Sequence, residues 1–387
     1  MASELLKRSE VREEDTWKTS DMYENTGAWE NELKEISALV DKAAAFEGKA
    51  AENADNLFVV LETLAKAGEK IEKAFNYAER LFDEDQTNTT HQAMSAKVYS
   101  LYAAMGSKTA FVDPEIHAAS EETLEGFLKE KPELELYRKQ LAEIRRLKEH
   151  CLSAEMEKLL AMTAEMSQTP ADTFSILNNA DLVFPEIKDE NGEKVRITHG
   201  RYGQFLQSAD RRVRKDAFEN LYQTYKQFLN TSASLYCGNV KQQVFHAKAR
   251  KYASSLECAV DANNVSSSVY HNLIDTVNKN LDKMHQYVSL RKKFLGVGEL
   301  HMYDIYTPMI ADVAKKISFE EAKETVLKAL APLGEDYVNK VKEGFENRWI
   351  DVYENQGKRS GAYSAGAYGC HPYVLLNYNG TLDDMFT

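Results

Sequence analysis

The sequence predicts a mainly α-helical fold with one small β-hairpin and an edge strand near the C-terminus. Only 7 of the 387 residues are proline and 18 are glycine, which is below the usual shares of roughly 5% and 7%, so few residues interrupt helices. Long stretches are rich in Ala, Leu, Glu and Lys, which lose little side-chain entropy in a helix. Strand-forming residues gather in only two places, residues 182–198 and 372–378.

The amino-terminal half is predicted to be a series of helices. Apolar residues recur at helical spacing at Ile71, Phe75, Ala78 and Phe82, which indicates one buried helix face. Further helices are expected at about 90–110, 120–150 and 153–167. Thr169, Pro170 and Asp172 then have the order of a capping hydroxyl, a first-turn proline and an early acid, so a new helix is expected to start there.

Residues 182–198 predict a β-hairpin, because two strand-like runs flank Asn191-Gly192, the strongest short turn pair. A long amphipathic helix is expected after the charged segment 210–216. That segment is either a phosphate-binding patch or a solvated helix end with internal ion pairs. Additional helices are predicted at about 235–257, at 266–294 with a stop at Gly296, from the capping box at Ser318 and Glu321 to Leu330, and at about 335–347.

Charge and composition exclude several classes of protein. The chain carries 48 basic and 61 acidic residues, a net charge of −13, which repels phosphate backbones and anionic lipids. We therefore expect no nucleic-acid partner and no membrane association, and no apolar stretch approaches the ~18 residues that span a bilayer. The four cysteines lie far apart, without the spacing of a disulfide framework or a zinc knot, so a cytoplasmic location is expected.

The segment 357–369 holds 4 of the 18 glycines, which favours close backbone approach. A phosphate loop is one alternative, but Ala367-Tyr368 stand where its Lys and Ser or Thr would be. The following residues 372–378 predict a strand with proline at its head, as on a sheet edge. An open edge would bind an extended peptide through its main chain, whereas the alternative is a core hairpin whose glycines serve the turn.

No complete catalytic or metal-binding group is recognisable in the sequence. None of the nine histidines lies three or four residues from another, so none forms the paired ligands of a helical zinc site. Ser360 and Ser364 lack the strand-to-helix turn of a nucleophilic serine. We therefore predict no catalytic residue and no metal ligand within this chain.

The last residues predict the start of a helix. Thr381 and Asp384 form a capping box, and Leu382, Met385 and Phe386 begin an apolar face. A helix of so few residues does not repay its nucleation cost. We therefore expect the sequence to be the front part of a longer one.

Four long motifs give the sequence its resemblance to a known family. They are Arg201–Arg214, Leu290–Lys293, His301–Tyr306 and His371–Tyr378. With them the whole chain resembles oligoendopeptidase F, a bacterial cytoplasmic zinc metallopeptidase related to thimet oligopeptidase and neurolysin. The resemblance implies a two-lobed helical fold, with an amino-terminal lobe at residues 1–200 that includes a helical subdomain near 113–185, and a truncated catalytic lobe at 201–387.

The resemblance also implies a function. In the intact parent protein, a His-Glu-x-x-His helix and a later glutamate would hold zinc, and the zinc-activated water would hydrolyse oligopeptides. Those groups would follow this chain, so the chain is expected to bind no zinc and to be inactive alone. The alternative is a non-catalytic helical peptide-binding or scaffold protein. The sequence leaves the oligomeric state open.

The family's substrate-binding strand implies which residues here contact oligopeptides. They belong to the glycine-rich segment and to the strand after it: Gly361, Ala362, Tyr363, Gly366, His371, Tyr373, Leu375 and Asn377.

Overall fold

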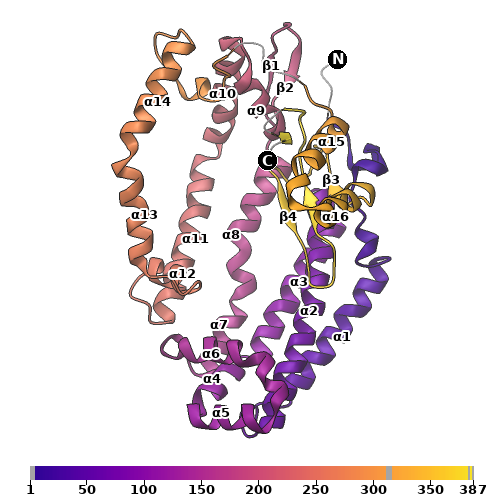
Figure 1. Cartoon of the computed structure of the whole chain (residues 1–387), viewed down its shortest axis with the longest axis vertical. Helices are drawn as coiled ribbons and strands as arrows, with labels where there is room; N and C mark the ends of the chain where they lie inside the picture. Colours follow the sequence, from indigo (N-terminus) through magenta and orange to yellow (C-terminus); the bar gives the residue numbers. More distant parts are fainter. Residues whose placement is uncertain (1–4, 311–315, 382–383, 386–387) are drawn as a thin grey trace.

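The computed structural model describes residues 5–310, 316–381 and 384–385. It confirms the mainly α-helical fold (Figure 1). The α-helices are α1 Thr26–Ala44, α2 Ala54–Glu84, α3 Thr89–Lys108, α4 Val112–Ala118, α5 Glu121–Glu130, α6 Arg138–Arg146, α7 Ala154–Met162, α8 Ala164–Ile176, α9 His199–Gln207, α10 Arg211–Gln227, α11 Leu229–Ala249, α12 Ser255–Asp261, α13 Ser267–Lys279, α14 Leu281–Phe294, α15 Phe319–Ala329 and α16 Glu335–Glu346. The strands are β1 Glu186–Lys188, β2 Lys194–Arg196, β3 Ile350–Asp351, β4 Tyr363–Ala365 and β5 Tyr373–Leu375.

Helices α1, α2 and α3 pack together as one arm of the molecule (Figure 1). Asn25, Asn53 and Asn88 cap their amino-terminal ends, and each accepts from free backbone amides of the first turn. The predicted face of α2 is present, since Ile71 and Ala78 are buried in the core of this arm.

The helix start predicted at Thr169 is wrong. Helix α8 begins earlier, at Ala164, and Pro170 lies inside it. Helix α8 packs against α11, with the Pro170 ring near Gly238, so tertiary packing outweighs the backbone donor that proline removes from a helix interior. A π-helical turn, Leu177–Asp181, extends α8.

The predicted hairpin is confirmed. Strands β1 and β2 pair antiparallel, with Ile187 opposite Val195, and Gly192 adopts φ +85° in the connection. The charged segment that follows caps and opens α10: Asp210 accepts from the Arg212 amide, and Arg212 pairs with Asp210 and Asp216. These ion pairs favour the helix-end interpretation over a phosphate-binding patch.

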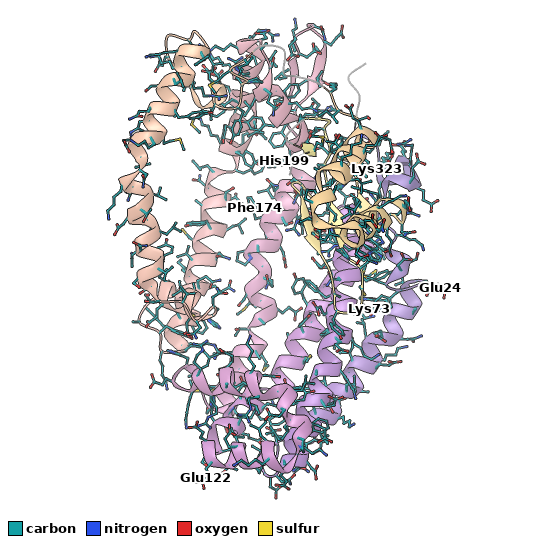
Figure 2. All side chains as sticks on the ribbon, in the orientation of Figure 1. Glu24, Lys73, Glu122, Phe174, His199 and Lys323 are labelled. Atoms are coloured by element: carbon teal, nitrogen blue, oxygen red, sulfur yellow. The ribbon has the colours of Figure 1, made fainter. Side chains whose placement is uncertain are left out.

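Helices α11 to α14 form a second arm (Figure 1). Of their residues only Ala247 and Arg291 are buried, and among the described parts of the chain no ribbon covers the outer side of α13 and α14 (Figure 2). Apolar side chains such as Leu273, Val277 and Met284 are therefore exposed. Gly296 ends α14 with φ +63°, as predicted.

The carboxy-terminal sheet has the order β3-β5-β4. Strand β5 pairs parallel with β3 and antiparallel with β4. The strand predicted at 372–378 is therefore present, but its predicted place at the edge is wrong, because β3 and β4 are the outer strands. Ser318 caps α15 through the Glu321 amide, as predicted.

The predicted capping box near the C-terminus is partly visible. The Asp384 amide donates to Thr381 Oγ1, and the Thr381 amide donates to Asp384 Oδ2. Leu382 and Phe386 lie outside the described residues.

No described helix is both long enough and apolar enough to cross a membrane.

Candidate functional site

Strand β4 presents an open edge. The amides of Val374 in β5 and of Leu376 just after it donate to the carbonyls of Trp349 and Asp351 on the β3 side. The main-chain groups of Tyr373 and Leu375 therefore face β4, because these groups alternate along a strand. The residues opposite them, Ala365 and Tyr363, complete those pairs. The N–H and C=O of Ser364 therefore point away from the sheet, and Ser364 is exposed.

The segment before β4 is held by main-chain and side-chain hydrogen bonds. The Arg359 amide donates to the main-chain carbonyl of Asp83. The side-chain amide of Asn377 donates to the carbonyls of Gly361 (2.7 Å) and Arg359 (3.1 Å). Gly361 has φ +86°, a conformation that favours glycine. These contacts place the entry to β4 on α2 and on the residues after β5.

Tyr363 of β4 turns its ring toward α2. Its hydroxyl donates to Asp83 at 2.5 Å, and the guanidinium groups of Arg80 and Arg359 lie 4.9 and 5.5 Å from its ring centroid. Burial and the neighbouring Asp83 raise the pKa of Tyr363 well above its ordinary value, so the hydroxyl stays protonated. The side chain of Tyr363 thus joins β4 to α2.

Two other predicted substrate contacts have buried side chains. Tyr373 is 1% exposed and Leu375 is 0% exposed, and both belong to the core that also contains Trp17 of the amino-terminal segment. Their side chains therefore anchor β5 to the helical arm. Gly361, Ala362 and Gly366 are exposed beside β4, so they remain candidates for contact with a peptide.

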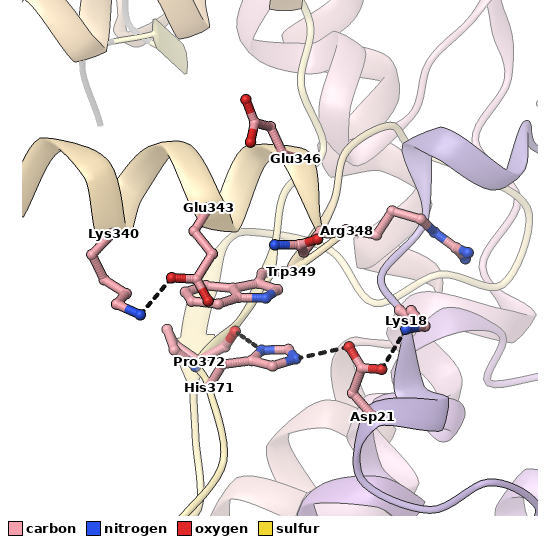
Figure 3. Close-up of a pocket in the computed structure, with 10 residues that line it drawn as sticks. Lys18, Asp21, Lys340, Glu343, Glu346, Arg348, Trp349, His371 and Pro372 are labelled. Carbon is pink, nitrogen blue, oxygen red and sulfur yellow. Dashed lines mark hydrogen bonds and ion pairs between the residues drawn. The ribbon is translucent and has the colours of Figure 1, made fainter.

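His371 lies on the β3 side of the sheet. Its ring stacks on Trp349, the residue before β3, with ring centroids 4.5 Å apart (Figure 3). Nδ1 lies 2.9 Å from the carbonyl oxygen of Pro372. Nε2 lies 3.4 Å from Asp21 Oδ2. His371 thus lines a polar pocket of about 600 Å³ with Lys18 and residues of α16, away from the open edge of β4.

A buried charge network supports this sheet. Lys358 Nζ lies 2.6 Å from Asp351 Oδ1, and Arg8 lies 2.6 Å from the other carboxylate oxygen and 3.0 Å from Glu84. Burial alone would raise the pKa of Asp351, but Lys358 and Arg8 outweigh it and lower this pKa. Burial, which outweighs the attraction of Arg8, raises the pKa of Glu84 to about 7. This network could not be recognised from the sequence because Arg8 lies 343 positions from Asp351.

The described residues do not fit a zinc ion. Within residues 5–310, 316–381 and 384–385, no three His, Cys, Asp or Glu side chains come close enough to hold a metal. A structural or catalytic zinc site needs at least three such protein ligands.

Comparisons with known proteins identify the class. A family described as "Peptidase family M3" matches residues 204–387, and one described as "Oligopeptidase F" matches residues 115–184. Together with the helical fold and the short carboxy-terminal sheet, these matches show that the chain belongs to peptidase family M3, with the amino-terminal region of the oligopeptidase F type.

Particular relatives refine this assignment. The chain is 44% identical to oligopeptidase PepF of Bacillus subtilis (strain 168) over its whole length, and 38% identical to group B oligopeptidase PepB of Streptococcus agalactiae over 98% of it. It spans 58% and 63% of the length of these relatives. The crystal structure of oligoendopeptidase-F from Enterococcus faecium matches 82% of this chain and 60% of that one, with a TM-score of 0.72 and 39% identity.

Proposed function

We propose that this chain supplies the peptide-binding wall of a zinc metalloendopeptidase that hydrolyses oligopeptides, and that an extended peptide pairs with the open edge of β4. The observation that carries the proposal is the outward-facing main chain of Ser364, with no hydrogen-bond partner among the described residues. Such an edge binds peptides through their backbone, with little dependence on their sequence. The exposed glycines around it, Gly361 and Gly366, leave room for a second backbone.

The proposal places the chemistry outside this chain. Zinc, when bound in the intact protein, activates a water for attack on the peptide carbonyl. The described residues supply no ligand set for it, and the chain spans 58% of the B. subtilis relative. The chain alone is therefore expected to bind oligopeptides without hydrolysing them, and a cytoplasmic location belongs to the same proposal.

The variant Ser364→Pro tests the peptide-binding edge. Proline removes the outward amide of Ser364 and no hydrogen bond of the sheet, because that amide does not face β5. One neutral hydrogen bond is worth ~0.5–1.5 kcal/mol, so the dissociation constant of a fluorescent extended octapeptide should rise roughly two- to tenfold. Anisotropy titration measures this, and Ser364→Ala, which keeps the amide, is the matched control.

Two results would count against the proposal. Equal affinity of wild type and Ser364→Pro would remove β4 as the binding edge. One equivalent of zinc in the isolated chain, together with chelator-sensitive cleavage of a quenched oligopeptide, would show that the catalytic groups lie within these residues.

A further inference from the structure

The π-helical turn Leu177–Asp181 lies where α8 meets the segment that precedes β4. Its characteristic bond runs from the Leu182 amide to the carbonyl of Leu177, five residues earlier. Turns of this kind are rare, and they occur frequently at functional sites. Sequence analysis gave no reason to single out any residue in it.

Asn179 in this turn binds the segment before β4. Its Oδ1 accepts from the Ser360 amide at 3.2 Å and from the Ser360 hydroxyl at 2.9 Å. Its Nδ2 donates to the Ser175 carbonyl at 2.8 Å. The donation to a carbonyl fixes which end of the amide is nitrogen, so Oδ1 must face Ser360.

The neighbouring Asn178 faces a different part of the molecule. Its Oδ1 accepts from the Tyr225 hydroxyl at 2.6 Å, and its carbonyl accepts from His199 Nε2 at 3.1 Å. Its Nδ2 donates to Asn179 Oδ1 at 3.1 Å. The π turn thus directs one asparagine to α9 and α10 and the next to the segment before β4.

The backbone of residues 359–361 is therefore held from two sides. Asn377 binds the carbonyls of Arg359 and Gly361, as described above, and Asn179 binds the Ser360 amide between them. Asn179 lies in the region that matches oligopeptidase F, residues 115–184, whereas Ser360 and Asn377 lie in the region that matches peptidase family M3, residues 204–387. The Asn179–Ser360 contact joins these two regions at the entry to the open edge.

We propose that Asn179 is a positioning residue, which holds residues 359–361 so that the edge of β4 is preformed for an extended peptide. This inference rests on the peptide-binding function proposed above. It assigns Asn179 no contact with the peptide: the residue acts through Ser360 and the backbone that leads into β4. A preformed edge binds more tightly because less ordering is required on binding.

Hydrogen exchange of the whole chain tests the positioning itself. In Asn179→Ala the Ser360 amide loses its acceptor, so amides of residues 360–364 should exchange roughly two- to tenfold faster, as expected for the loss of one or two neutral hydrogen bonds. Asn179→Asp keeps an acceptor oxygen and should restore much of the protection. Tyr225→Phe, which removes the hydroxyl bound by Asn178 in the same turn and keeps the Asn178–Asn179 hydrogen bond, is the matched control and should leave this segment unchanged.

Peptide affinity gives the second readout. The dissociation constant of the octapeptide should rise several-fold in Asn179→Ala and stay near the wild-type value in Tyr225→Phe. If wild type binds no peptide, the proposed function fails, while the exchange data still decide whether Asn179 positions the segment. Equal exchange of residues 360–364 in Asn179→Ala and Tyr225→Phe, or faster exchange with unchanged peptide affinity, would overturn the inference.

Discussion

Replacing Lys358 with methionine is expected to destabilise the protein strongly. The Lys358 side chain is 0% exposed and that of Asp351 is 1% exposed, with 2.6 Å between Nζ and Oδ1. Nζ also donates to the carbonyl of Tyr353 at 2.6 Å. Methionine has a similar volume but leaves the Asp351 charge compensated by Arg8 alone. Removing one partner of a buried pair costs ~3–5 kcal/mol, so the free energy of unfolding should fall by about that amount.

Urea unfolding followed by circular dichroism measures this loss. Lys340→Met is the matched control, because Lys340 Nζ lies 2.5 Å from Glu343 but its side chain is 67% exposed, and exposed pairs contribute about 0–1 kcal/mol. Adding Asp351→Asn to Lys358→Met removes the uncompensated charge and should recover part of the loss.

Protonation gives an independent check on the same reasoning. Burial raises the pKa of Asp351 and Lys358 is the largest influence that lowers it, so this pKa should be higher in Lys358→Met than in wild type. The deficit of Lys358→Met should therefore be smaller at pH 5 than at pH 8. A loss of less than about 1 kcal/mol, or losses that are equal in Lys358→Met and Lys340→Met, would refute the argument that this charge network stabilises the sheet.

Two further predictions concern pH and glycine. The pKa of Glu84 is raised from 4.5 to about 7, so the stability contributed by its neutral form is complete below pH ~4.5 and is lost as the pH rises through 7. The free energy of unfolding, measured by urea titration, should therefore fall less between pH 5 and 8 in Glu84→Gln than in wild type, by a difference of up to about 3 kcal/mol. Equal dependence on pH in the two proteins would contradict this prediction. A Cβ on Gly238 would lie 3.5 Å from Pro170, whereas one on Gly344 would lie 2.9 Å from the Trp349 ring. Gly238→Ala should raise the free energy of unfolding by ~0.5–1 kcal/mol through helix propensity, whereas Gly344→Ala should lower it; thermal unfolding measures both. If Gly344→Ala proved more stable than Gly238→Ala, these contacts would not determine the effect of the added methyl group.

The sequence predicted correctly the turns and helix caps that depend on interactions between neighbouring residues. Asn191-Gly192 sets a turn by its own backbone preferences, and Ser318 caps a helix through an amide three residues away; both are confirmed. The Thr169-Pro170 signal is equally local, but it failed. Packing of α8 against α11, whose Gly238 lies 68 positions after Pro170, outweighs that local signal.

The order of the strands could not be predicted from local patterns. Strand β3 is only two residues long, too short for any alternation to reveal it, and its pairing moves β5 from the edge to the centre. The same limit applies to single contacts. Ser360 and Asn179 are separated by 181 positions, and neither residue carries a motif, so only the folded chain brings them together.

The open edge of β4 is supported by segments from both ends of the chain. Its neighbour β5 packs through Tyr373 and Leu375 into the core that contains Trp17, Trp29 and Ile71, and Asp351 of β3 is paired with Arg8 near the amino terminus. The sheet therefore depends on the amino-terminal arm for its apolar contacts and for part of its charge balance. If Asn179 holds the entry to β4 as proposed, a displacement of α8 against the first arm would also displace this edge. The substitutions Asn179→Ala and Tyr225→Phe separate that contact from the one that the same turn makes with α10.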